Sequence, residues 1–269
     1  MRSSLIPSPR KPGHIAVRLV DIILIVFNSP DHQKPPATMR RFLRDQLVFL
    51  REFGGKFETT GSLVPSSRFL AKAVTRYLAQ RESSPIRVLE CGPGTGAFTN
   101  QIVRQLHEGD RFDLVELNES FVEVLHKRFA TEPHWKAASQ HAEIHQQLLQ
   151  DFDGHGPYDF IISGLPHVNF SPEIVETIFQ SYFRLLKPGG TLSYFEYAYI
   201  RPLRAALTIG KTRQKIGGVN AIVTEHLANH RIHRDSVLAN FPPAWAHHLR
   251  IANAQTPTST IEVPRSLSQ

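Results

Sequence analysis

The sequence of 269 residues has a single cysteine, Cys91, so it cannot form an intramolecular disulfide. This fits a protein that works in a reducing compartment. The sequence also lacks the HExxH and CxxC spacings of common metal sites, although it holds 14 histidines. Scattered histidines usually occupy surface and packing positions, so we expect no metal site. No repeat is visible at the spacing of solenoid proteins.

A long, uninterrupted hydrophobic run is missing as well. The apolar stretch IAVRLVDIILIVF at 15–27 is too short to span a bilayer and contains Arg18 and Asp21. The residues after Phe27 make a poor signal-peptide cleavage site. Prolines are frequent in this region, which is typical of linkers. We therefore expect residues 1–38 to be a disordered or non-native extension, with Met39 as the initiator.

Positive charge, by contrast, is in excess. The formal net charge is +7, which suits an anionic partner such as nucleic acid, an anionic membrane surface or a phosphorylated substrate. Hydrophobic residues make up 41% of the chain, as in an ordinary globular protein, and this excludes wholesale disorder. The polar composition of residues 251–269 predicts a mobile tail.

Helical and strand patterns alternate through the middle of the chain. The expected helices are 65–80, 97–106, 120–129 and 171–186, and the expected strands are 86–90, 112–116, 159–164 and 191–198. This order predicts an α/β fold with a doubly wound, mainly parallel sheet. A further helix is expected at 39–55, where arginines lie between apolar residues spaced by three and four. Its periodicity alone favours packing on the core over a position in a membrane interface.

The glycine-rich stretch ECGPGTG at 90–96 lies between the first expected strand and its helix. Ligands of doubly wound sheets bind at such strand ends, where glycines allow tight turns and close approach of the backbone. Glu116 follows Gly96 by 20 residues, at the end of the next strand, where a carboxylate can accept both ribose hydroxyls. The pattern therefore predicts an adenosine-containing cofactor. It also fits the dinucleotide motif G-x-G-x-x-A from Gly92, so the glycines alone leave a dehydrogenase open.

Three features favour a different cofactor. Glu90 would repel a pyrophosphate but suits a ligand with an ammonium group, Pro93 lies within the loop, and KPGG at 187–190 precedes the late strand. Together they resemble class I S-adenosylmethionine-dependent methyltransferases, which have a Rossmann-like fold.

A narrower resemblance extends over residues 39–250. The chain is similar to the bacterial phospholipid N-methyltransferases, soluble peripheral enzymes that methylate phosphatidylethanolamine to its monomethyl, dimethyl and choline forms. The resemblance implies a methyltransferase domain with N-terminal helices and S-adenosylmethionine as cofactor. The segments that carry it are GSLVPSSRFLA (61–71), VLECGPGTGAFT (88–99), LVELNESF (114–121), SGLPHVNF (163–170), LKPGGTLSYFEY (186–197) and NFPPAW (240–245).

The resemblance also implies roles for matching residues. Those lining the cofactor would be Glu90, Gly92, Gly94, Gly96 and Glu116, and those beside the reactive methyl group would be Ser163, Gly164, Leu165 and Pro166. For the adenine amino group, related enzymes use an acidic residue before alanine, where this chain reads QHAEI at 140–144. Either His141 or Glu143 would replace it. His167 is a conceivable base, although a loop position without that role fits it better.

The resemblance further implies a lipid substrate whose phosphate needs a partner. Candidates at the mouth of the site are Tyr197, Tyr199, Arg201 and Arg204, although packed tyrosines and surface arginines are an equal alternative. Because the lipid stays in the bilayer, helix 39–55 would dock on an anionic membrane. We expect a cytoplasmic enzyme on the inner face of the cell membrane, with the insertion 202–233 as a lid.

Two other functions remain open. An rRNA adenine N6-dimethyltransferase shares the fold, but its loop offers an aromatic residue after the proline, where this chain has His167, and it carries a separate C-terminal helical domain. A non-catalytic membrane- or RNA-binding protein could also keep the fold. Intact Glu90, loop glycines and Glu116 argue against that alternative, and nucleic acid is not the favoured partner.

Overall fold

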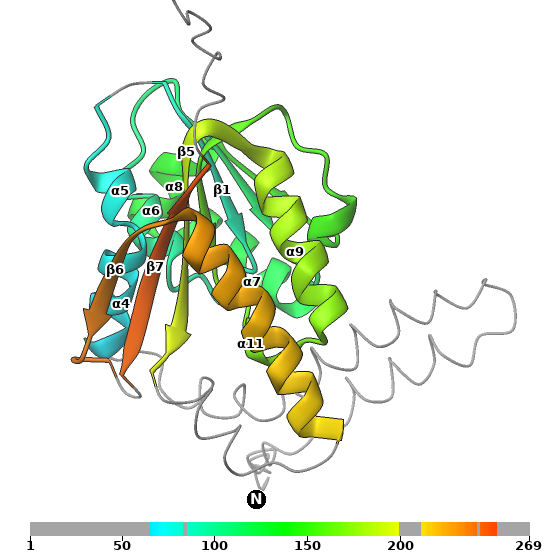
Figure 1. Cartoon of the computed structure of the whole chain (residues 1–269). Coiled ribbons are helices and arrows are strands. Elements are labelled where there is room, and N and C mark those ends of the chain that lie inside the picture. Colours follow the sequence, from blue (N-terminus) through cyan, green and yellow to red (C-terminus); the bar gives the residue numbers. More distant parts are fainter. Residues whose placement is uncertain (1–64, 83–84, 199–210, 241–242, 252–269) are drawn as a thin grey trace, which may run out of the picture. The chain divides into compact units, whose positions relative to one another are not determined.

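The computed structural model describes residues 65–82, 85–198, 211–240 and 243–251. They form a seven-stranded sheet in the order β3-β2-β1-β4-β5-β7-β6 (Figure 1). Strands β1 to β5 pair in parallel, and β7 is antiparallel to both of its neighbours. The doubly wound, mainly parallel sheet expected from the sequence is confirmed. The strands are β1 (Arg87–Cys91), β2 (Arg111–Val115), β3 (Ala142–His145), β4 (Tyr158–Ser163), β5 (Leu186–Tyr197), β6 (Arg231–Val237) and β7 (Ala244–Arg250).

Helices cover both faces of the sheet. Residues of α4 to α8 share one hydrophobic core with one face, whereas α9 and α11 lie together over the other (Figure 1). The helices are α4 (Pro65–Val74), α5 (Arg76–Ala79), α6 (Thr99–Ile102), α7 (Glu119–Thr131), α8 (Pro133–Ala138), α9 (Pro172–Leu185) and α11 (Lys211–His230), with short 3₁₀ turns η2 (Ser139–His141), η3 (Leu149–Asp151) and η4 (His167–Asn169). Among the described helices, none has both the length and the apolar character needed to cross a membrane.

The central strands are apolar because both of their faces are covered. On β1, Val88 belongs to the core under α4 to α8, and the next residue, Leu89, is equally inaccessible to solvent. Successive side chains of a strand point to opposite faces, so a strand between two helical layers reads as a nearly continuous hydrophobic run. Glu90 interrupts this run at a fully buried position, which marks it as more than a packing residue.

The helices and strands expected within the described residues appear, with shifted ends. The expected helix 65–80 is divided at Thr75, whose hydroxyl donates to the Ala71 carbonyl over 2.8 Å, and the expected helix 97–106 is α-helical only over α6. Strands β3, β6 and β7 were not expected. Two of them are edge strands, whose polar outer positions weaken the hydrophobic pattern.

Some sequence expectations fall outside the described residues. These are the extension 1–38, the helix 39–55, residues 202–210 and the tail from 252 onward. Of the segment 202–233, the described part forms α11 and the first residues of β6. Helix α11 is part of the helical layer on one face of the sheet, since it packs on α9 and on β6 and β7.

Candidate active site

The carboxyl ends of β1 and β4 meet at the point where the strand order reverses. From β1 the chain continues outward to β2 and β3, and from β4 it continues to β5 on the other side. Open α/β sheets bind their ligands at such a switch point. The loop after β1 is the glycine-rich stretch 90–96, and the loop after β4 contains Gly164 to Pro166. The two segments that the sequence assigned to cofactor and catalysis therefore lie side by side.

Direct backbone contacts hold the two loops together. The Gly164 amide donates to the Cys91 carbonyl over 2.8 Å. A Cβ atom on Gly164 would lie 2.5 Å from the Gly92 carbonyl oxygen. At this distance a side chain would force the backbone to move. Glycine at 164 is thus required by the approach of the two loops.

The glycine loop is held in a single shape by its surroundings. Gly92, Gly94 and Gly96 all have positive φ values, of 67°, 57° and 86°, which residues with a side chain rarely adopt. Arg128 donates to the Thr95 carbonyl over 2.6 Å, and its guanidinium lies 4.1 Å from the centre of the Trp135 ring. The loop is therefore preorganised before any ligand arrives.

Glu90 supplies an unsatisfied buried carboxyl oxygen beneath this loop. Its Oε2 accepts from the Thr99 hydroxyl over 2.7 Å, while Oε1 has no hydrogen-bond partner among the described residues. Burial raises the pKa of Glu90 to about 8, although the bond from Thr99 acts in the opposite direction. A buried polar atom without a partner is costly, so this oxygen is suited to a hydrogen-bond donor on a ligand. An ammonium group, as on the methionine part of S-adenosylmethionine, fits it.

Glu116 connects the end of β2 to the glycine loop. Its two carboxylate oxygens accept from the Gly94 amide over 3.0 Å and from the Asn118 amide over 2.9 Å. Burial raises the pKa of Glu116, and hydrogen bonds from backbone amides oppose the shift. These contacts position the side chain beside the glycines, where the sequence expected a ribose.

The loop after β4 carries no exposed base. Ser163 is fully buried, and its hydroxyl lies 2.6 Å from the Tyr182 hydroxyl of α9. Burial raises the pKa of Tyr182 well above its usual value, so it stays a neutral phenol. His167 is also buried, 3.2 Å from the same hydroxyl and stacked on Phe179. The arrangement can position an amine but offers no strong general base, in agreement with the sequence interpretation of His167.

His141 is not brought to this site. It ends η2, directly before β3, and β3 runs parallel to β2. It therefore lies at the amino-terminal edge of the sheet, whereas the glycine loop and Glu116 lie at the carboxyl edge. The residues of this segment at the carboxyl edge come after His145, whose carbonyl accepts the Glu116 amide over 3.1 Å. The backbone amide of Gln147 donates to the same carbonyl, so Gln147 lies at the carboxyl edge. Recognising AEIH as a strand would have placed Gln147 there from the sequence.

The expected phosphate partners are only partly described. Tyr197 is half-buried against the core, with its ring 5.3 Å from that of Phe195, and burial raises its pKa. For Tyr197 this agrees with the alternative given above, a tyrosine that packs on the core instead of binding the substrate phosphate. The other three candidates, Tyr199, Arg201 and Arg204, lie outside the described residues.

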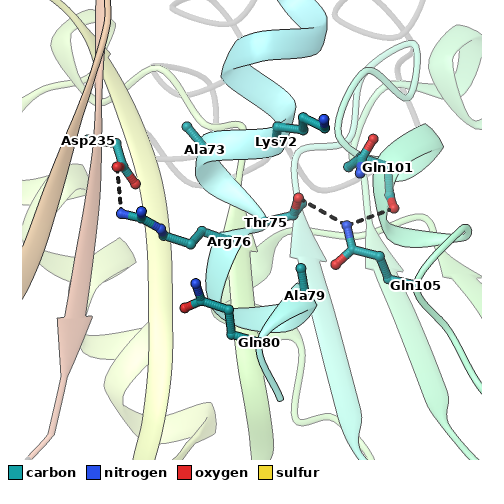
Figure 2. Close-up of a pocket in the computed structure, with 9 residues that line it drawn as sticks. All are labelled: Lys72, Ala73, Thr75, Arg76, Ala79, Gln80, Gln101, Gln105 and Asp235. Carbon is teal, nitrogen blue, oxygen red and sulfur yellow. Dashed lines mark hydrogen bonds and ion pairs between the residues drawn. The ribbon is translucent and has the colours of Figure 1, made fainter.

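A separate hollow of about 360 Å³ is lined by residues of α4, α5, the segment from α6 to Gln105, and β6. Figure 2 draws these residues as sticks. Arg76 reaches across it to Asp235 on β6 over 2.7 Å, and Gln105 donates to the Thr75 hydroxyl over 3.2 Å (Figure 2). No residue of the glycine loop or of the loop after β4 lines it. We interpret it as a structural polar junction that ties α5 to the edge of the sheet.

The fold and the site define a class of protein. A doubly wound sheet with an acidic, glycine-rich loop after β1, a carboxylate after β2 and a loop packed beside them after β4 is that of class I S-adenosylmethionine-dependent methyltransferases. The chain has the fold of this class, and S-adenosylmethionine is its cofactor.

Comparisons with known proteins agree. Residues 88–190 match the family model described as a methyltransferase domain. The chain is 29% identical over 151 residues to an ornithine lipid N-methyltransferase of Singulisphaera acidiphila, covering 56% of this chain and 77% of that protein. This relative confirms the resemblance to lipid N-methyltransferases.

Solved structures share the fold. The N-methyltransferase NodS from Bradyrhizobium japonicum, in complex with S-adenosylhomocysteine, is 17% identical with a TM-score of 0.51, over 70% of this chain and 88% of that one. An O-methyltransferase from Bacillus cereus, in complex with the same compound, is 14% identical with a TM-score of 0.51, over 86% of this chain and 97% of that one.

Proposed function

We propose that the chain transfers methyl groups from S-adenosylmethionine to the amino head group of a membrane lipid, phosphatidylethanolamine or its methylated forms. The observation that carries the proposal is the contact between Gly92 and Gly164, because it brings the cofactor loop and the loop after β4 to one point. When bound, the cofactor supplies an electrophilic methyl group, so the protein needs to hold an unprotonated amine in line with it. Well-oriented reactants can gain about 7–11 kcal/mol from positioning alone.

The loop after β4 is suited to that task. Backbone carbonyls of Ser163, Gly164 and Leu165 can accept amine hydrogens and direct the nitrogen lone pair, and that of Leu165 also accepts from the His167 amide over 3.1 Å. The Leu165 amide donates to the Ser163 hydroxyl over 3.1 Å, which fixes the turn. The absence of a strong base among the described residues of this loop agrees with an amine acceptor, whose lone pair is available once it is deprotonated.

The lipid part of the proposal is supported by the relative from Singulisphaera, whose name describes methyl transfer to the nitrogen of a lipid. Its substrate is ornithine lipid, and this favours a second candidate substrate for our chain. Both candidates present an amine at a membrane surface. We further propose that the enzyme is peripheral on the inner face of the cell membrane, where its net charge of +7 favours anionic lipid.

The rRNA alternative is less well supported by the loop after β4. The residue after Pro166 is His167, which is only 2% exposed. Its ring contacts Phe179, Tyr182 and Tyr194 in the interior. A side chain turned inward in this way does not offer a flat surface for stacking a base from solvent.

The test is incubation of the full chain with methyl-labelled S-adenosylmethionine and vesicles containing phosphatidylethanolamine, ornithine lipid or neither, followed by mass spectrometry of the lipid extract. We expect successive additions of methyl groups to phosphatidylethanolamine. Labelling of ornithine lipid alone would change the proposed substrate to ornithine lipid and would retain the proposed methyl transfer to a lipid amine. A parallel incubation replaces the vesicles with RNA, and labelling of RNA but of neither lipid would reject a lipid substrate.

A pair of variants links the activity to the site. Gly164→Ala should lower methyl transfer more than about tenfold, since its Cβ would lie 2.5 Å from the Gly92 carbonyl oxygen. Gly217→Ala is the matched control, because a Cβ at Gly217 meets nothing within 4 Å. Equal activities of the two variants would show that the contact between the loops is not needed for catalysis.

A further inference from the structure

Four side chains with metal-binding groups gather on the edge of the sheet formed by β2 and β3 and on the loop before β4. They are Asp113, Glu143, His145 and His155, and one nitrogen or oxygen atom of each lies within 4.8 Å of those of the others. Two histidines and two carboxylates are a donor set that zinc commonly uses. The cluster plays no part in the proposed methyl transfer.

Glu143 lies within reach of both histidines, through one carboxylate oxygen for each. His155 Nε2 lies 3.4 Å from Glu143 Oε2, and His145 Nδ1 lies 4.0 Å from Glu143 Oε1. Two ligands bound tetrahedrally at about 2.0–2.2 Å from zinc lie roughly 3.4 Å apart. Glu143 and His145 reach the same side because residues two apart on a strand point to the same face.

The fourth group, Asp113, orients His145. Asp113 is buried, its Oδ1 lies 2.8 Å from His145 Nε2, and its Oδ2 accepts from the Tyr158 hydroxyl over 2.8 Å. With a proton on Nε2 donated to Asp113, the lone pair of Nδ1 faces Glu143. A carboxylate that holds the far nitrogen of a histidine is a recurrent feature of metal sites, where it fixes the tautomer and the ring. The Phe152 ring, 4.8 Å from the His145 ring, adds packing.

We propose that Glu143, His145 and His155 bind one divalent transition metal ion, with zinc as the best match, and that Asp113 positions His145. A cavity of about 410 Å³ beside the cluster leaves room for water as a fourth ligand, and its lining includes Glu143 and His155 as well as Arg87 and Arg111. The ion would join β3 to the loop before β4. It would also act close to the cofactor, since the His145 carbonyl accepts the amide of Glu116 over 3.1 Å.

The competing explanation is a set of ordinary ion pairs, in which protons on the histidines replace the metal. Glu143 and His155 have side chains 64% and 56% exposed, so such pairs would add little stability. The two explanations differ in one measurable property, the affinity for zinc at neutral pH.

The experiment titrates zinc chloride into the full chain, prepared without a polyhistidine tag and freed of metal by a chelator, in a calorimeter. We expect one strong site per chain and a rise in melting temperature with zinc. His155→Ala and Glu143→Gln, both at exposed positions that should not disturb folding, should each weaken binding at least tenfold. Asp113→Asn should weaken it about 10–100-fold. The matched control is His107→Ala, which removes an exposed histidine outside the cluster.

Cobalt provides an independent readout, because a visible absorption band of bound cobalt should appear with wild type and His107→Ala but not with His155→Ala. Two results would overturn the proposal. One is the same zinc affinity for wild type, His155→Ala and Glu143→Gln, which would place the ion at other histidines. The other is no zinc binding by the folded wild type.

Discussion

Glu116, directly after β2, links this strand to the glycine loop by a hydrogen bond from the Gly94 amide. It accepts from two backbone amides, those of Gly94 and Asn118, while it lies where a ribose is expected. A buried carboxylate in this position serves two purposes. It fixes the loop in the absence of ligand, and it remains a strong acceptor for ligand hydroxyls.

Replacing Glu116 with alanine should therefore weaken S-adenosylmethionine binding about 10–100-fold, the loss expected for hydrogen bonds of about 1.5–3 kcal/mol to a charged group. Titration calorimetry measures the effect. Glu119→Ala, which removes an exposed carboxylate three residues away, is the control. Unchanged affinity in Glu116→Ala would remove Glu116 from the cofactor site.

Glu90 makes the stability of the ligand-free protein depend on pH. Its folded pKa of about 8 lies above the ordinary value of 4.5, so between these values the folded chain retains a proton that the unfolded chain has released. The stability contributed by Glu90 is therefore complete below pH 4.5 and is lost as the pH rises through 8.

Glu90→Gln, which cannot ionise, should remove this dependence. The melting temperature of wild type relative to Glu90→Gln should fall between pH 5 and pH 9 in the absence of ligand. Melting curves by circular dichroism at several pH values measure the difference. A difference that stays constant with pH would mean that Glu90 does not titrate in this range.

Among the secondary-structure elements, α11 shows how closely the helices of one face pack. Two adjacent glycines of this helix have opposite surroundings. A Cβ on Gly217 meets nothing within 4 Å, whereas a Cβ on Gly218 would lie 2.7 Å from Cγ of Pro172, the first residue of α9. The approach of the two helices thus depends on one glycine and not on its neighbour.

The two glycines provide a matched test. Gly217→Ala should stabilise the protein by about 0.5–1 kcal/mol, since glycine is a poor residue in a helix interior. Gly218→Ala gains the same propensity but overpacks against a rigid proline ring, so it should destabilise by about 1–3 kcal/mol. Urea unfolding measures both. Stabilisation by both substitutions would show that α11 and α9 do not pack this closely.

For the molecule as a whole, the net charge of +7 is the property that bears on membrane docking. Lys211, Arg213 and Lys215 are three basic residues at the start of α11. Each basic residue near an anionic surface contributes about 1 kcal/mol, and this attraction decreases with salt.

Replacing all three with alanine should reduce binding to anionic vesicles roughly a hundredfold at low salt. Sedimentation with anionic and with neutral vesicles measures it. The control is Arg104→Ala/Lys127→Ala/Lys136→Ala, which removes the same charge from exposed positions on α7, α8 and the segment after α6. Equal binding of both triple variants would show that α11 has no particular role in docking.

Much of the site could be read from the sequence, because its parts are local. The glycine loop follows β1 directly, Glu116 follows β2, and residues 163–166 follow β4. Parallel strands place all three loops at one edge of the sheet, so the order of strands and helices is enough to bring them together. An adenosine-containing cofactor followed from this arrangement, and S-adenosylmethionine followed from the resemblance of the motifs to a known class.

Only the tertiary structure determined the positions of side chains on or beside strands whose sequence pattern is weak. His141 looked suitable for the adenine until β3, four residues long and polar, was found to begin after it. Tyr197 became a packing residue because the core lies beneath its ring.

The cluster of Asp113, Glu143, His145 and His155 shows the same limit at longer range. Its members come from two strands and a loop, so no local spacing reveals them, and only the parallel pairing of β2 with β3 brings them together. The sequence by itself therefore determined the fold class and the cofactor loop, since these follow from contiguous segments. Contacts between segments far apart in the chain were determined by the strand register.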